Sequence, residues 1–150
     1  MLDFDHFKRV NDRHGHSGGD LALREIGRAL RGALRREDKA GRFGSEEFLV
    51  LLPGAGEREI HIVAERLRAA VEGLQISFMG RAITLTVSVG GSAIRASDDS
   101  WLEAIDRADN GLYAAKSEGR NRVVLRLDPS VSVPRRRSAL TLGLPAGHAT

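Results

Sequence analysis

Segments with two different apolar spacings alternate along this chain of 150 residues. Some carry apolar residues at the spacing of a helix face, and others are short and apolar or alternate apolar with polar residues, as strands do. We expect strands at residues 1–5, 39–43, 46–53, 84–90 and 122–127, and helices at residues 21–34, 57–74 and 100–117. This alternation predicts one sheet with helices packed on it, an α/β fold of the α+β sandwich type.

Turn and cap residues set several of these boundaries. Gly44-Ser45 separates two strand-like segments and predicts a hairpin with this pair at its tip. Gly18-Gly19-Asp20 is typical of a helix start, with Asp20 as the capping side chain. Ser100 is expected to cap the last helix and Gly119 to end it.

Composition limits the core and the metal chemistry. The chain is 41% apolar but only 5% aromatic, so one domain with an aliphatic core is expected, at residues 1–127. It has no cysteine, which excludes disulfides and thiolate ligands and favours metals that bind oxygen, such as magnesium or manganese. Residues 128–150 have no apolar period, and we expect a flexible or disordered tail there.

The net charge of +3 does not indicate a nucleic-acid partner. The tail holds Arg135, Arg136 and Arg137 against Asp128, and so supplies two of the three net positive charges. The remaining body mixes both signs, and nucleic-acid binding through the tail is the weakest alternative. Without a run of eighteen apolar residues, we expect a soluble cytoplasmic domain, whose parent protein is free to be attached to a membrane.

Acidic residues occur at two places that the predicted sheet could bring together. Asp3 and Asp5 on one strand point to the same face, where they either share a cation or lie at a solvated strand end. Glu46 and Glu47 follow the predicted turn, and alternation would let only one of them join Asp3 or Asp5 at a magnesium ion. The alternative is a hairpin tip whose acids only aid solubility.

Other polar residues have the chemistry of nucleotide contacts. Residues 6–12 are expected to form a helical turn that faces an anion, with Lys8 adding a charge for phosphate. Asn11 and Asp20 match the hydrogen-bonding edge of guanine, although capping is the commoner use of such an aspartate. Lys116 and Arg120 either reach phosphate oxygens or complement the dipole of the preceding helix.

Taken in order, these segments resemble the GGDEF family of diguanylate cyclases, from Met1 to about Leu127. The matching segments are Asp3-Phe4-Asp5-His6-Phe7-Lys8, Asn11-Asp12, Gly15-His16, Gly19-Asp20, Arg42-Phe43-Gly44-Ser45-Glu46-Glu47-Phe48, Ser88-Val89-Gly90, Ala108-Asp109, Leu112-Tyr113, Ala115-Lys116 and Gly119-Arg120-Asn121. The resemblance implies a fold like that of nucleotidyl cyclases and polymerase palm domains, with a central, mostly antiparallel sheet.

The resemblance also implies a reaction and its residues. It implies that two GTP molecules are joined into cyclic-di-GMP, with release of pyrophosphate, between two domains of a homodimer. The implied metal ligands for Mg²⁺ (or Mn²⁺) are Asp3, Glu46 and the Phe4 carbonyl, and the implied catalytic acids are Glu46 and Glu47. The implied substrate contacts are Lys8, Asn11, Asp20, Gly44, Lys116 and Arg120. A sensory or regulatory domain is expected upstream in the parent protein.

A second site is implied by the same resemblance. Arg35 and Asp38 match the Arg-x-x-Asp product-inhibition site of the family, and Arg66 matches an arginine that joins it from a neighbouring domain. The alternative is a charged helix end in which Arg35 and Asp38 pair at i, i+3.

Two departures from the family pattern favour a weakly active domain, or a receptor that only binds GTP or cyclic-di-GMP. Ser45 replaces the usual second glycine of the motif, and a left-handed backbone there would cost about 1–2 kcal/mol. The helix that usually precedes the first strand of the family is missing, so the domain is expected to be N-terminally truncated.

Overall fold

Five short strands form the central sheet of the computed structural model, which describes residues 1–127. In sheet order they are β2 (Lys39–Arg42), β3 (Glu47–Leu51), β1 (Leu2–Phe4), β6 (Val87–Ser92) and β7 (Val123–Arg126). Every neighbouring pair is antiparallel except β6 with β7. The predicted fold class, with a mostly antiparallel sheet, is confirmed. The predicted tail at 128–150 lies outside the described residues.

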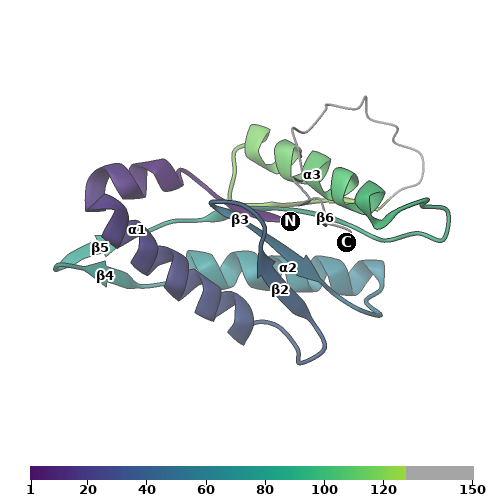
Figure 1. The fold of residues 1–150 in the computed structure, drawn as a ribbon, viewed down its shortest axis with the longest axis horizontal. Helices are drawn as coiled ribbons and strands as arrows, with labels where there is room; N and C mark the ends of the chain where they lie inside the picture. Colours follow the sequence, from purple (N-terminus) through teal and green to yellow (C-terminus); the bar gives the residue numbers. More distant parts are fainter. Residues whose placement is uncertain (128–150) are drawn as a thin grey trace, which may run out of the picture.

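Helices cover both faces of this sheet (Figure 1). Helices α1 (Phe7–Gly32) and α2 (Glu57–Glu72) pack on one face, and α3 (Trp101–Ser117) packs on the other. Since strand side chains alternate, Leu2 and Phe4 enter the core under α1 and α2, whereas Met1 packs with α3. Asp3 therefore belongs to the α3 face.

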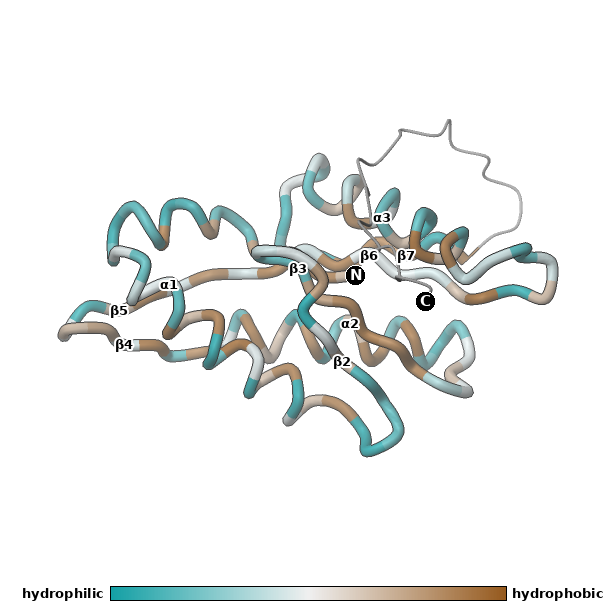
Figure 2. The backbone as a smooth tube through the Cα atoms, viewed as in Figure 1, coloured by the Kyte–Doolittle hydropathy of each residue, from teal (hydrophilic) through white to brown (hydrophobic). Residues whose placement is uncertain are grey.

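The larger core is aliphatic, as the composition predicts. Leu2, Ile26, Leu30 and Val71 are at most 1% exposed, and full burial of such a side chain contributes roughly 1.5–3 kcal/mol. Figure 2 shows hydrophobic positions gathered where the strands meet α2, and hydrophilic positions on the outer turns of α1.

Helix α1 differs from the prediction at its start. It begins at Phe7 rather than near residue 21, so Gly18 and Gly19 lie inside it and Asp20 is not its cap. A break at Gly15, with φ 70° and ψ 172°, divides α1 into two helical runs. Glycine tolerates this backbone because it has no Cβ. The first run is the helical turn that the sequence predicts at 6–12.

The sequence prediction missed a small hairpin between α2 and β6. Strands β4 (Ile76–Phe78) and β5 (Arg81–Ile83) join through Met79 and Gly80, both at positive φ, as a type I′ turn requires. The Phe78 ring packs on Gly18 of α1, since a Cβ there would lie 3.3 Å from it. The strand predicted at 84–90 begins later, at Val87.

Helix α3 lies very close to the sheet because two glycines face each other. A Cβ on Gly90 of β6 would collide with the Ala108 carbonyl, and one on Gly111 would lie 2.5 Å from the Val124 carbonyl. The helix begins as predicted, with the Ser100 hydroxyl accepting from the Leu102 N–H at 3.2 Å.

We expect Gly111→Ala to lower the free energy of unfolding by about 1–3 kcal/mol, because the new methyl group forces α3 away from β7. Gly27→Ala is the matched control in a helix interior, where the nearest atom to an added Cβ is 3.7 Å away. It should stabilise the fold by about 0.5–1 kcal/mol through helix propensity. Urea unfolding measures both, and equal effects of the two substitutions would contradict the close contact.

Candidate functional site

The end of β1 lies against the tip of the β2–β3 hairpin. Asp3 is paired with Glu47 in the antiparallel register, and the Phe4 N–H donates to the Glu46 carbonyl at 3.3 Å. The Phe43 N–H donates to the Glu47 carbonyl at 2.8 Å, which leaves Gly44, Ser45 and Glu46 as a three-residue loop. The structure therefore brings together the acids that the sequence places more than forty residues apart.

Both glutamates lie near Asp3, Glu47 as its partner in the neighbouring strand and Glu46 as part of the hairpin loop. Directly opposed residues of an antiparallel pair share a face, so Glu47 lies with Asp3 on the α3 face. Glu46 precedes β3 and belongs to the loop, where strand alternation does not apply. The pKa values of Glu46 and Glu47 are both raised, first by burial and then by the charge of Asp3.

Lys116 reaches this cluster from the last turn of α3. Its Nζ lies 2.7 Å from Asp3 Oδ1. Burial raises the pKa of Asp3, and the hydrogen bond and charge of Lys116 oppose that shift. The cluster is therefore a set of three crowded carboxylates that one ammonium group partly neutralises.

The oxygen atoms of this cluster fit a hard divalent cation. Among residues 1–127, no group of three or more His, Cys, Asp or Glu side chains is arranged as a metal site. The crowded carboxylates of Asp3 and Glu46 and the main chain of Phe4 supply oxygen donors, which magnesium and manganese prefer. Burial raises the pKa values of Asp3 and Glu46, and a neighbouring positive charge, like that of Lys116, opposes these shifts. Metal ligation by these residues stays a prediction.

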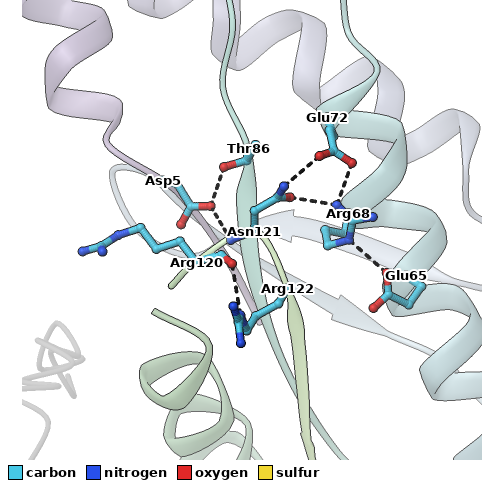
Figure 3. Close-up of polar contacts among 8 residues, drawn as sticks. All are labelled: Asp5, Glu65, Arg68, Glu72, Thr86, Arg120, Asn121 and Arg122. Atoms are coloured by element: carbon cyan, nitrogen blue, oxygen red, sulfur yellow. Dashed lines mark hydrogen bonds and ion pairs between the residues drawn. The ribbon is translucent and has the colours of Figure 1, made fainter. Parts of the chain in front are cut away.

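Asp5 serves the scaffold instead. Its buried carboxylate accepts from the Thr86 and Ser88 hydroxyls, both at 2.7 Å, and from the Asn121 N–H at 3.0 Å. Figure 3 shows the bonds from Asp5 to Thr86 and to Asn121. Because protein donors occupy both of its oxygen atoms, the structure favours Asp3 over Asp5 for a cation.

The two predicted guanine contacts lie on either side of the break in α1. The Asn11 side chain lies against Gly19, where a Cβ would collide with its Oδ1. Asp20 follows Gly19 and is exposed. Lys8 is exposed on the first helical run, just after Asp5. Because the chain changes direction at Gly15, Asn11 of the first run lies close to Gly19, the residue before Asp20.

Arg120 follows α3 in a left-handed turn that the sequence did not reveal. Its N–H donates to the Ala115 carbonyl at 2.9 Å, the closing bond of a Schellman motif. Gly119, Arg120 and Asn121 all have positive φ, of 119°, 65° and 46°. Burial raises the pKa of Asp3, and the positive charge of Arg120 is one of the influences that oppose this shift.

The loop of the hairpin is shaped by Gly44 and Arg42. A Cβ on Gly44 would collide with Glu47 Oε2, so glycine makes room for this carboxylate. Arg42 was not predicted to have a role, yet its Nε donates to the Gly44 carbonyl at 3.0 Å and its Nη2 to the Ser45 carbonyl. The only signal was an arginine just before the Gly-Ser turn. Ser45 is not among the positive-φ residues, so the expected condition for strain does not arise.

The predicted product-site residues lie apart from the acid cluster. The Arg35 N–H donates to Asp38 Oδ2 at 2.9 Å, which closes the turn after α1. The Arg35 guanidinium lies 3.8 Å from Glu59 of α2 rather than pairing with Asp38. Arg66 is exposed on α2. Product binding by these three residues stays a prediction.

We expect Glu47→Gln to raise the thermal midpoint near pH 7, because it removes one crowded charge. The folded-state pKa of Glu47 lies above the ordinary value of 4.5, so ionisation of Glu47 destabilises the fold as pH rises through that range. The gain should disappear as pH falls through this raised pKa, where wild-type Glu47 is neutral. Melting curves between pH 4 and 8 measure it, with Glu37→Gln as the control at an exposed site. A gain that does not change with pH would contradict this account.

Known proteins match this chain over nearly all of its described length. The family model for "Diguanylate cyclase, GGDEF domain" matches residues 1–122. Diguanylate cyclase A of Treponema denticola is 40% identical over 125 residues, which are 83% of this chain and 34% of that protein. Diguanylate cyclase DgcP of Pseudomonas aeruginosa is 44% identical over 82% of this chain and 18% of that protein. The chain thus spans about a third of the first relative and less than a fifth of the second.

Solved structures agree with this match. The diguanylate cyclase SiaD of Pseudomonas aeruginosa, in complex with its activator SiaC, gives a TM-score of 0.80 at 41% identity, over 83% of this chain and 48% of that chain. The GGDEF domain of DgcB from Caulobacter crescentus, in complex with cyclic-di-GMP, gives 0.78 at 31% identity, over 83% and 74%. Both the sequence motifs and the sheet that brings their acids together therefore show that the chain belongs to the GGDEF domain family of diguanylate cyclases.

Proposed function

We propose that this domain condenses two GTP molecules into cyclic-di-GMP and pyrophosphate. The observation that carries the proposal is the cluster of Asp3, Glu46 and Glu47 at the end of β1, beside Lys116 and Arg120. Crowded carboxylates next to two cations suit a metal-assisted reaction on a triphosphate.

Each side chain has a defined task in this reaction. When bound, a magnesium or manganese ion neutralises triphosphate charge and polarises the α-phosphorus. Lys116 and Arg120 hold the phosphate oxygens, with Lys8 adding charge from α1. Asn11 and Asp20 bind the guanine edge.

The proton of the attacking ribose hydroxyl goes to Glu46 or Glu47. The 3′-oxygen of each GTP forms a bond to the α-phosphorus of the other, the bond between each α-phosphorus and its bridging oxygen breaks, and two pyrophosphates leave. Because burial raises the pKa values of both glutamates, each is a better proton acceptor than an exposed glutamate. A single domain supplies one GTP, so two domains must face each other in a homodimer.

A receptor that binds GTP or cyclic-di-GMP without turnover is the second candidate. The short distance between Lys116 and Asp3 favours it, because this ammonium already partly neutralises the predicted metal ligand. The main proposal includes three further features. Cyclic-di-GMP inhibits the domain by binding at Arg35, Asp38 and Arg66. The parent protein has an upstream regulatory domain and is located in the cytoplasm.

Incubation with GTP and magnesium tests the reaction. The protein, fused to a dimerising coiled coil, should release cyclic-di-GMP and pyrophosphate, and Glu46→Ala should slow this at least about a hundredfold through loss of a base and metal ligand. Glu25→Ala, which removes an ion pair with Arg28 on α1, is the control and should remain active. Absence of product from the wild-type dimer refutes the cyclase. Retained binding of GTP in that case supports the receptor.

Inhibition by cyclic-di-GMP tests the product site. Arg35→Ala and Arg66→Ala should each raise the inhibitory concentration of cyclic-di-GMP by about tenfold or more, because each removes a charged contact to the product. Arg28→Ala is the control, because Arg28 is an exposed arginine of α1 outside the predicted product site. It should leave the inhibition by cyclic-di-GMP unchanged. Unchanged inhibition in both test variants would place the product elsewhere.

A further inference from the structure

Side chains of α2 hold the turn that carries Arg120. The side chain of Asn121 accepts from Arg68 Nη1 at 2.8 Å and donates to Glu72 Oε1 at 2.7 Å. Arg68 also donates to Glu65 and Glu72, at 2.9 and 2.8 Å. Figure 3 shows this group on one side of the turn, with the Arg120 side chain extending to the other side.

The backbone of the turn, residues 119–121, needs such support. Arg120 and Asn121 are two consecutive non-glycine residues at positive φ, a region that side chains with a Cβ disfavour. On one side the turn is closed by the bond from Arg120 N–H to Ala115, and on the other by the bond from Asn121 N–H to Asp5. The Arg120 carbonyl also accepts from Arg122 Nε at 3.2 Å, and the side chain of Asn121 links the turn to α2.

We propose that Arg68 and Glu72 are positioning residues for the triphosphate, because their bonds to Asn121 fix the direction in which Arg120 points. The proposal rests on the proposed function, in which Arg120 binds phosphate. It assigns a positioning role to Arg68 and Glu72 of α2, through Asn121 of the turn, although none of the three contacts substrate. Within α2, the ion pairs of Arg68 with Glu65 and Glu72 are partly exposed and contribute little stability alone. The bonds to Asn121, 53 and 49 residues away along the chain, are what joins α2 to the site.

A double-mutant cycle on the affinity for a non-reacting GTP analogue, measured with magnesium, tests this link. Arg68→Ala should weaken binding by about tenfold, as Arg120→Ala does, because a charged phosphate contact is misplaced or lost. Arg68→Ala combined with Arg120→Ala should bind no more weakly than Arg120→Ala alone, because both act through one contact. Glu72→Ala should also weaken binding, because it removes the acceptor of both the Asn121 side-chain amide and Arg68.

Arg107→Ala is the matched control. The Arg107 side chain is 18% exposed, like that of Arg68, and binds Asp98 and the Ala93 carbonyl far from the turn. It should lower the thermal midpoint and leave the affinity for the analogue unchanged at temperatures where the variant is folded. A similar loss of affinity in Arg107→Ala would show that general destabilisation explains the effect.

Hydrogen exchange of the Asn121 backbone N–H, which donates to Asp5, tests the turn in the absence of nucleotide. Arg68→Ala should speed this exchange by about tenfold, because the turn then opens more often. Unchanged exchange, or losses of affinity in Arg68→Ala and Arg120→Ala that add, overturn the positioning role. If the wild type binds no GTP analogue, the proposed function itself fails and the positioning role with it. If it binds and Arg68→Ala binds equally well, only the positioning role fails.

Discussion

The main-chain pairing of β1 on both of its sides is the interaction on which the site depends. This strand has three residues, yet it pairs with β3 and β6, which lie more than forty and more than eighty residues away along the chain. The pairing sets Asp3 opposite Glu47 on one side and opposite Ser88 on the other. Glu47 of β3 and Lys116 of α3, two of the predicted site residues, both lie against Asp3 of this short ladder.

Negative charge is concentrated where the ladder ends. Burial is the main cause that raises the pKa values of Asp3, Glu46 and Glu47, and the charge of Asp3 adds to the shift of the two glutamates. The folded state therefore disfavours the ionised forms of these three acids. Asp5, only two residues from Asp3, instead accepts hydrogen bonds from three protein donors. Neighbouring acids of one motif thus differ in role because of their hydrogen-bond partners, which no spacing rule reveals.

The sequence predicts most of the elements because their signals are local. The apolar face of α2, the extent of α3, the Ser100 cap and the Gly44-Ser45 turn all appear near the predicted positions. The start of α1 was mispredicted because two glycines and an aspartate are typical of a helix start, whereas the break lies at Gly15. The hydrogen bonds of Arg42 to the hairpin loop and of Arg68 to Asn121 were missed. They depend on loop carbonyls and on tertiary contacts, which leave no pattern in the sequence.

The alternation of side chains along β1 has a consequence for misfolding. A shift of β1 by one residue against its neighbours would turn Asp3 and Asp5 toward the aliphatic core and expose Leu2 and Phe4 to the opposite layer. Burying unpaired carboxylates in that core costs several kcal/mol, roughly a large part of the stability of a domain this size. A chain with the shifted register would therefore fail to fold rather than form a compact inactive state. The hydrophobic core thus selects the register in which the acids are aligned.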